Sequence, residues 1–136
     1  MIDAEMRAYT QNNEGCSLKV YLDTRGAPTV GYGHKCTRGT TIPQAAADII
    51  FQADYDLAVS GYRTLRLDLD DVRRSVIIDM IFQMGIVGVS KFDDMLTALR
   101  NKDFPRAANE LMESDYARVT PKRAECNAER IKTGRM

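Results

Sequence analysis

Residues 14–34 read EGCSLKVYLDTRGAPTVGYGH, and this stretch decides the fold that we expect for the first third of the chain. Within it, residues 19–22 are rich in Val and Tyr, residues 25–28 supply turn-forming residues, and residues 29–32 complete a predicted β-hairpin. Just upstream, residues 2–12 carry apolar side chains on one narrow side, which predicts a short helix. The sequence therefore predicts a helix followed directly by a small hairpin.

Two carboxylates and one hydroxyl stand at defined places in this segment. Glu14 lies where the helix gives way to a glycine, Asp23 follows nine residues later, and Thr29 follows Asp23 by six. Because the turn folds the strand back, Asp23 and Thr29 are expected to face each other at the hairpin mouth, with Glu14 across a gap. Hydrolysis of a glycosidic bond uses such a pair: one acid donates a proton to the leaving oxygen, and one carboxylate activates water. An acid before a turn is more often simply solvated, so spacing alone leaves a structural role open.

The sequence around these residues favours a catalytic role over a structural one. The pattern E-x8-D-x5-T, embedded in EG…L…Y.DT.G.PTVGYGH, closely resembles the catalytic segment of the phage-type lysozymes, glycoside hydrolase family 24, and of the T-even phage enzymes in particular. Residues 72–74 (VRR) with 79–85 (DMIFQMG) resemble the central helix of those enzymes, and residues 120–124 (TPKRA) resemble their closing helix. The resemblance covers nearly the full chain, with its motifs in the right order.

The resemblance implies an endolysin, a muramidase that hydrolyses the β-1,4 bond between N-acetylmuramic acid and N-acetylglucosamine in peptidoglycan for bacterial cell lysis. It implies Glu14 as the general acid, and Asp23 with Thr29 as the groups that hold and activate the attacking water. With water between sugar and base, we expect inversion and carboxyl groups about 6.5–9.5 Å apart. The resemblance implies no cofactor and no metal.

Further site residues follow from the same resemblance. Phe82 and Gln83 match positions that line the cleft from the helical side and bind substrate, although a core role suits Phe82 equally well. Arg123 matches an arginine that lies against the catalytic glutamate and orients it. His34 matches a histidine that forms an ion pair with the position of Asp54, a structural link between the hairpin and the connecting helix.

The rest of the chain is predicted to be helical. Thr41 and Gln44 form a capping box that begins a long helix over residues 41–60. Gly61 is expected to end this helix, and its inward side is expected to comprise Ala46, Ile49, Ile50, Ala53, Leu57 and Ala58. Apolar residues around more than one face predict that residues 70–84 form a helix surrounded by others. Shorter helices are predicted over residues 91–101, 105–114 and from Thr120 to near Gly134.

These elements predict an α+β, predominantly α-helical protein in one domain, residues 1–136, and the resemblance implies that its fold is lysozyme-like. Residues 13–40 would form a small β-containing lobe, residues 41–60 a connecting helix, and residues 61–136 a helical lobe on which helix 2–12 packs. The helix 2–12 would bury Ile2, Met6 and Tyr9, with Asp3 as an acceptable cap. The link from the hairpin to the long helix is shorter than in the T-even lysozymes, so we expect a smaller lobe and a more open cleft.

Composition bounds the partners. The 136 residues are 44% hydrophobic and 28% charged, which is ordinary for a soluble globular protein, and the formal net charge is zero. No general attraction to nucleic acid or membrane is therefore expected. We also expect a monomer. No stretch approaches the roughly 20 apolar residues of a membrane span, and no signal peptide is recognised. We therefore expect synthesis in a host cytoplasm and release to peptidoglycan through a holin. Cys16, Cys36 and Cys126 are expected to be free thiols, because they are odd in number and lack metal-ligand spacing.

Three alternatives stay open. A lytic transglycosylase on a similar fold would need the acid but not Asp23 or Thr29. A non-catalytic wall-binding module would keep the fold without needing the three site residues. A tail-associated or secreted antibacterial lysozyme domain would keep the chemistry in another setting.

Overall fold

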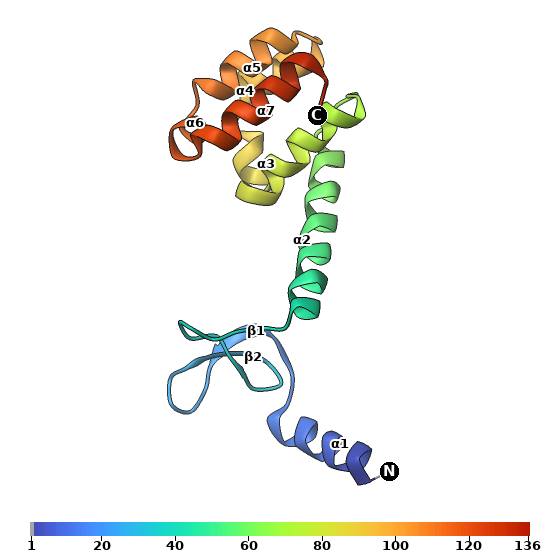
Figure 1. The fold of residues 1–136 in the computed structure, drawn as a ribbon, viewed down its shortest axis with the longest axis vertical. Helices are drawn as coiled ribbons and strands as arrows, with labels where there is room; N and C mark the ends of the chain where they lie inside the picture. Colours follow the sequence, from blue (N-terminus) through green and yellow to red (C-terminus); the bar gives the residue numbers. More distant parts are fainter. Residues whose placement is uncertain (1) are drawn as a thin grey trace. The chain divides into compact units, whose positions relative to one another are not determined.

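The computed structural model describes residues 2–136, with side chains from Ala4 onward, so the predicted roles of Ile2 and Asp3 lie outside the described side chains. The described chain is mostly helical with one small antiparallel sheet, which confirms the predicted fold class (Figure 1). It divides into two compact units, residues 1–44 and 45–136. The elements of the first unit are α1 (Ile2–Glu14), β1 (Ser17–Leu22), β2 (Pro28–Gly31) and β3 (His34–Lys35). Those that follow are α2 (Gln44–Thr64), α3 (Asp71–Ser90), α4 (Asp93–Arg100), α5 (Phe104–Met112), α6 (Asp115–Val119) and α7 (Pro121–Thr133).

The sheet of the first unit has the order β1-β2-β3, and both pairs are antiparallel. Tyr21 lies opposite Thr29 in the β1–β2 hairpin, and a bulge-like irregularity precedes Tyr21 on β1. Thr29 in turn lies opposite Lys35 of β3. The hairpin was predicted, whereas β3 was not, because two residues are too few to show a strand periodicity.

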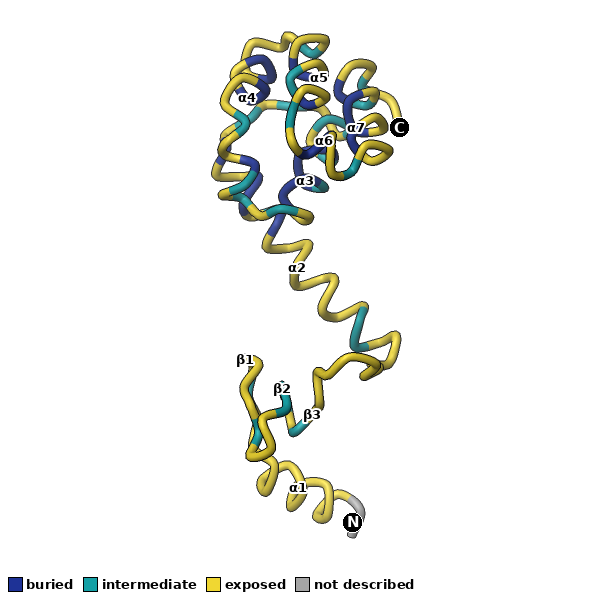
Figure 2. Tube along the Cα trace, turned by 90° about the vertical axis from the view of Figure 1, so that its left-hand side faces the viewer, coloured by how far each residue is buried: buried dark blue, intermediate teal, exposed yellow. Residues whose placement is uncertain are grey.

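The first unit buries little of its surface. Among its described side chains Thr29 alone is buried, and α1 and β1 are exposed along most of their length (Figure 2). Met6 and Tyr9, which were expected to lie on the apolar side of helix 2–12, are both more than half exposed. The packing of that helix on the helical lobe stays a prediction, because it concerns the arrangement of the two units.

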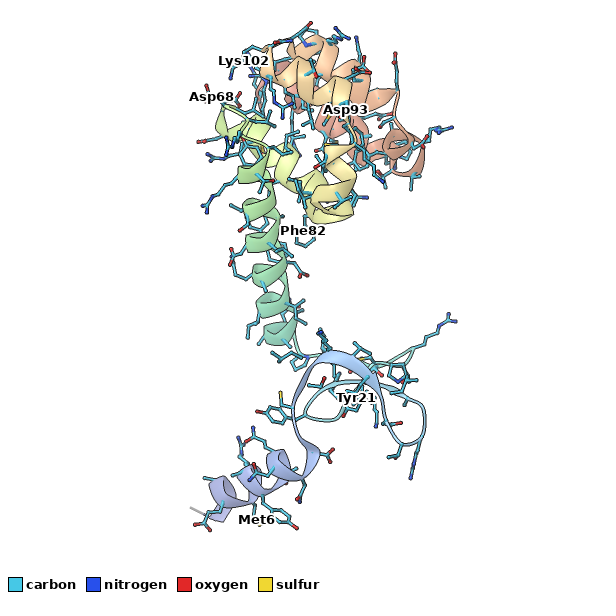
Figure 3. All side chains as sticks on the ribbon, turned by 180° about the vertical axis from the view of Figure 1, so that it is seen from behind. Met6, Tyr21, Asp68, Phe82, Asp93 and Lys102 are labelled. Atoms are coloured by element: carbon cyan, nitrogen blue, oxygen red, sulfur yellow. The ribbon has the colours of Figure 1, made fainter. Side chains whose placement is uncertain are left out.

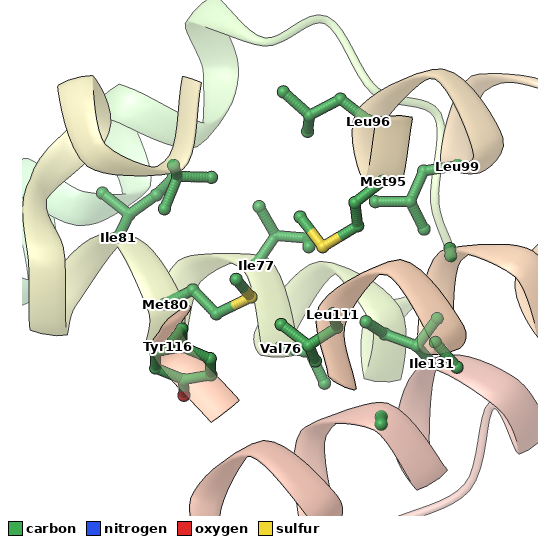
Figure 4. Packing of buried hydrophobic residues seen from close by; sticks show 14 of the residues in the cluster. Val76, Ile77, Met80, Ile81, Met95, Leu96, Leu99, Leu111, Tyr116 and Ile131 are labelled. Atoms are coloured by element: carbon green, nitrogen blue, oxygen red, sulfur yellow. The ribbon is translucent and has the colours of Figure 1, made fainter. Parts of the chain in front are cut away.

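The second unit contains the hydrophobic core. Side chains of α3 lie at its centre, where Val76, Ile77 and Met80 are almost fully buried (Figure 4). Residues from the following helices close around them, among them Met95, Leu99, Leu111 and Ile131. The all-round apolar pattern of residues 70–84 correctly indicated a helix enclosed by others. Burial of these side chains is the main force that holds helices α3 to α7 together.

The long helix α2 differs from the prediction in two ways. It begins at Gln44 rather than at residue 41, because the residue before Pro43 is disfavoured in helical backbone. It continues through Gly61 to Thr64, and a Cβ on Gly61 would lie 3.2 Å from Ile86 Cβ. This glycine therefore permits close packing between α2 and α3 instead of ending the helix.

The inward side predicted for α2 is mostly wrong. Ala58 is buried, but Ile49 and Leu57 are 72% and 73% exposed. The buried residues of α2 all lie in its C-terminal part, where it packs against α3. An apolar stripe predicts which side of a helix could be covered, and the N-terminal part of α2 has that stripe without a cover inside its own unit.

Glycine also bends α3. Gly85 has φ 81° and ψ 161°, outside the helical region, so two helical segments meet there. The prediction that the helix ends at Gly85 is thus correct for its first segment, and the second segment runs on to Ser90. The closing helix α7 ends as predicted at Gly134, which has a left-handed backbone. The short helix α6 was not predicted, because it spans only five residues.

Arg73 joins three helices of the second unit. Its Nε donates to the carbonyl oxygen of Ile131 on α7 at 2.6 Å, and its guanidinium lies 3.5 Å from the ring centre of Phe104 on α5. On α3 itself, Asp70 caps the first turn and accepts a hydrogen bond from the Arg73 guanidinium at 2.8 Å. A second link at the same end of the unit is the ion pair between Asp68 and Lys102 (Figure 3).

Within the described residues, no single helix has the length and apolar character needed to cross a membrane. Helices α3 and α4 reach that standard only when taken together, as a pair bent by 101°.

Candidate active site

The three predicted catalytic residues line one hollow in the first unit. This hollow has a volume of about 640 Å³, and its walls come from the end of α1, the β1–β2 turn and β3. Glu14, Asp23 and Thr29 all contribute to it, as does Tyr21, which points out from β1 (Figure 3). The structure therefore brings together, within a single compact unit, the residues that the sequence singled out.

Glu14 is the last residue of α1. The helix stops because Gly15 adopts φ 66°, and the Gly15 N–H bonds back to the carbonyl oxygen of Gln11 at 2.9 Å. The Glu14 carboxylate lies against Gly33, where an added Cβ would stand 2.7 Å from Oε2. The second glycine of the sequence GYG thus provides space for the Glu14 carboxylate beside the sheet.

Asp23 is held by the turn that follows β1. Its Oδ1 accepts hydrogen bonds from the N–H groups of Arg25 and Ala27, both at 2.8 Å, and its Oδ2 forms an ion pair with Lys35. The Lys35 hydrogen bond and then the Ala27 N–H lower the pKa of Asp23 from 3.8 to about 2. Asp23 is therefore a carboxylate throughout the neutral and mildly acidic range.

Thr29 lies buried beneath this turn. Its hydroxyl donates to the carbonyl oxygen of Ala27 at 2.9 Å, and the same carbonyl accepts the Asp23 N–H at 3.0 Å. The expectation that Asp23 and Thr29 face each other across the hairpin is wrong, because Thr29 lies opposite Tyr21, two residues before Asp23. The two site residues nevertheless meet through Ala27, because both bond to that residue.

This hydrogen-bond pattern makes the two groups differ in what they can offer to the hollow. The Thr29 hydrogen is committed to Ala27, and the Thr29 side chain has no exposed surface. The ionised Asp23 carboxylate is an acceptor and keeps 16% of its side-chain surface exposed. Asp23 is therefore the member of the pair that can accept a hydrogen bond from a water molecule in the hollow.

The remaining predicted site residues belong to the second unit, except His34, which is exposed on β3. Phe82 is partly exposed and its ring centre lies 5.4 Å from that of Phe51, while Gln83 is exposed (Figure 3). Asp54 lines an apolar hollow between α2 and α3. The His34–Asp54 ion pair and the approach of Phe82 and Gln83 to the substrate stay predictions.

Arg123 has a partner that the sequence did not indicate. Its Nε and one terminal nitrogen donate to the two carboxylate oxygens of Asp79 at 3.0 and 2.6 Å. Asn127 also donates to Asp79 at 3.0 Å. Burial would raise the pKa of Asp79, but the hydrogen bonds from Arg123 and Asn127 outweigh it and leave the pKa lowered. The predicted contact of Arg123 with Glu14 stays a prediction.

Lys35 is the site residue that sequence reasoning missed. It lines the same hollow as Glu14 and Asp23, and it directly follows the GYGH string. A third strand after the hairpin would have placed it opposite Thr29, but a two-residue strand leaves no pattern to read.

Metal-ligand geometry does not occur in the part of the chain that is described: no group of three or more His, Cys, Asp or Glu side chains is placed to hold an ion. Cys16, Cys36 and Cys126 are free and exposed.

Two carboxyl groups at one hollow, with Asp23 fixed and ionised, are the arrangement that glycoside hydrolases use. The model of the phage lysozyme family matches residues 11–126, and the chain belongs to this family. It is a lysozyme-type glycoside hydrolase, and its substrate is peptidoglycan.

Relatives occur in a cellular organism and in a phage. The chain is 28% identical to probable T4-type lysozyme 1 of Dictyostelium discoideum, an alignment that covers 90% of each protein. It is 29% identical to probable T4-type lysozyme 2 of the same organism, over 82% of this chain and 84% of that protein. It is 27% identical to the pre-baseplate central spike protein Gp5 of Enterobacteria phage T4, over 88% of this chain but 26% of that protein. Each aligned stretch is longer than this chain, so each relative has residues without a counterpart here.

Proposed function

We propose that the chain is an inverting muramidase that cleaves the β-1,4 bond between N-acetylmuramic acid and N-acetylglucosamine. The observation that carries this proposal is the hollow shared by Glu14, Asp23 and Thr29, in which Asp23 is an ionised carboxylate held by two backbone N–H groups. A water that donates a hydrogen to Asp23 attacks through its free lone pair. An attack of this kind from the side opposite the leaving group inverts the anomeric carbon.

The proposed reaction assigns one role to each residue. Glu14, protonated, donates its proton to the glycosidic oxygen as the bond to the anomeric carbon breaks. The water loses its proton to Asp23 as its oxygen bonds to that carbon, so charge and protons balance across the site. The negative charge of Asp23 also stabilises the positive charge that develops on the sugar ring. Thr29 orients the water and takes no proton.

Substrate contacts from the second unit form part of the same proposal. Gln83 is proposed to address the N-acetyl and hydroxyl groups of the sugar through its side-chain amide, and Phe82 to line the binding cleft. Arg123 is proposed to orient Glu14, and the His34–Asp54 pair to link the two units. These roles are supported by the family to which the chain belongs, since matching motifs extend over both units.

The first experiment identifies products from purified peptidoglycan by mass spectrometry. The wild type is expected to release hydrated, reducing muropeptides, and Asp23→Asn is expected to release almost none. Initial products followed by proton NMR are expected to be the α-anomer, because inversion of a β-bond gives α. Anhydro-muropeptides from both proteins would overturn the proposal in favour of a lytic transglycosylase. An initial β-anomer would overturn inversion.

We also propose that the enzyme acts in lysis as a monomer, made in a host cytoplasm and released to the wall through a holin. Its test is expression in a bacterium with and without controlled permeabilisation of the inner membrane. Lysis only after permeabilisation is the expected result, with Asp23→Asn as the inactive control. Lysis without permeabilisation would overturn the need for a holin.

A further inference from the structure

The strand β3 carries a cation into the candidate active site. Lys35 lies directly opposite Thr29 in the β2–β3 pair, and the N–H of the next residue, Cys36, donates to the carbonyl oxygen of Pro28 at 2.7 Å. From this fixed backbone the Lys35 ammonium reaches Asp23, twelve residues away in sequence. The ion pair therefore depends on the third strand and not on the hairpin alone.

The ion pair completes the coordination of the Asp23 carboxylate. Two backbone N–H groups already occupy Oδ1, and Lys35 occupies Oδ2. A carboxylate oxygen accepts about two hydrogen bonds, so Oδ2 has one position left. That position is the only one from which Asp23 can receive a proton from water without breaking one of these three bonds.

The two partners of the ion pair differ in their exposure to solvent. The Asp23 side chain is only 16% exposed, whereas the Lys35 side chain is about half exposed. The lysine can keep its remaining hydrogens in water while one of them stays on Asp23. The Lys35 ammonium therefore stays hydrated and charged, and its positive charge favours the ionised form of Asp23.

We propose that Lys35 is a positioning residue of this lysozyme, which fixes the direction of Asp23 Oδ2 and keeps Asp23 ionised in acid. The inference rests on the proposed role of Asp23 as the group that activates water. Lys35 does not touch the reacting atoms: it acts through the carboxylate that it holds.

A direct test follows the carbon-13 resonance of the Asp23 side-chain carboxyl through an acid titration. In the wild type the pKa is expected at about 2, and in Lys35→Met it is expected to rise toward 3.8. The rise is not complete, because Arg25 and Ala27 still donate to Oδ1. Lys35→Arg, which restores the cation, is expected to bring the value back down.

The matched control is Lys19→Met. Lys19 is an exposed lysine on β1 of the same unit and lies outside the lining of the hollow. Lys19→Met changes the net charge by the same amount as Lys35→Met, so it measures how far a change in net charge alone shifts the pKa of Asp23. An Asp23 pKa that is equal in Lys35→Met and Lys19→Met would overturn the proposal.

The second measurement is the acid limb of kcat/KM between about pH 1.5 and 6, with folding followed by circular dichroism. In Lys35→Met the limb is expected to move up in pH by the same amount as the Asp23 titration, and Lys35→Arg is expected to reverse the move. If the pKa of Asp23 rises in Lys35→Met but the acid limb of kcat/KM does not move, Lys35 does not act on catalysis through Asp23. That result would also count against Asp23 as the base of the proposed reaction. A titration that stays fixed would overturn the role of Lys35 and leave the proposed reaction intact.

Discussion

The Glu14 carboxylate lies so close to Gly33 that a Cβ on this glycine would stand 2.7 Å from Oε2 and 3.3 Å from Cδ. Gly33 also has φ 75°, a backbone conformation that suits glycine. Gly33 is therefore required for two separate reasons: its backbone has a positive φ, and the Glu14 carboxylate occupies the space of a side chain. Substitutions at Gly33 and at a control glycine can separate these two reasons.

Gly33→Ala is expected to lower activity by more than tenfold, because the methyl group must displace the carboxylate that we propose as the general acid. The matched control is Gly31→Ala, at φ 67° with no atom within 4 Å of the added Cβ. Both variants are expected to lose about 1–2 kcal/mol from backbone strain. Measured by urea unfolding and by wall hydrolysis, they should therefore agree in stability and differ in activity. Equal activities would show that Gly33 serves the backbone alone.

Thr29→Val keeps the buried shape but removes the hydroxyl. Ala27 still accepts the Asp23 N–H, so the expected loss of stability is only about 0.5–1.5 kcal/mol. Activity is expected to fall by about 10–100-fold, because the water loses one of its two acceptors. Thr29→Ser, which keeps the oxygen, is expected to retain most of the activity at a similar cost in stability. Equal losses of activity in Val and Ser variants would contradict the water-holding role.

Arg73 and Arg74 are neighbours whose replacement is expected to change stability by very different amounts. Arg73 is 14% exposed and donates to Asp70 and to two carbonyl oxygens of α7, whereas Arg74 is 48% exposed and pairs with an exposed Asp71. Arg73→Met is expected to cost about 2–3 kcal/mol, because the α7 carbonyls lose a charged donor. Arg74→Met is expected to change stability by less than about 0.5 kcal/mol. The two free energies of unfolding, measured by denaturant titration, would contradict this account if they were equal.

Asp79 is expected to make the stability of the second unit depend on pH. Its pKa is lower in the folded than in the unfolded protein, so ionised Asp79 stabilises the fold above about pH 4, and this contribution is lost as pH falls through the lowered value. Asp79→Asn should lose about 1 kcal/mol or less near pH 6, since the pair with Arg123 is partly solvated. The deficit should shrink below pH 4.

Thermal unfolding of the wild type and Asp79→Asn from pH 2.5 to 6 measures this effect. Glu129→Gln, at an exposed position on α7, serves as the control and should show a smaller difference at pH 6. A deficit for Asp79→Asn that stays constant down to pH 2.5 would show that the pKa of Asp79 is the same in both states.

Much of this molecule could be predicted from its sequence, for reasons that differ by element. The pattern of residues 70–84 predicted a buried helix, because their apolar side chains follow the helical repeat on more than one face. Glu14, Asp23 and Thr29 could be placed near one another from the predicted helix and hairpin, and the resemblance to the phage-type lysozymes assigned them to one site; they line the same hollow. Gly134 ended α7 as expected of a left-handed cap.

What the sequence did not reveal depends on contacts between distant residues. Gly61 looked like a helix end, but its role is to let α2 approach Ile86, which lies on another helix. Lys35 and Asp79 were given no role from the sequence, and each has a partner that only the folded chain brings near. Local patterns carry no information about such pairs, because the spacing between partners is set by the fold and not by a repeat.

The contrast in burial between the units has a consequence for heat inactivation. Glu14, Asp23 and Thr29, the proposed catalytic residues, belong to a unit whose described side chains include one buried residue, whereas the helical unit has a continuous core. Local opening costs least where few apolar contacts must be broken. On heating, activity is therefore expected to be lost at a lower temperature than the helical structure. Substitutions that increase heat tolerance should be made in the unit that contains the sheet, because stabilising the helical unit would not protect the candidate active site.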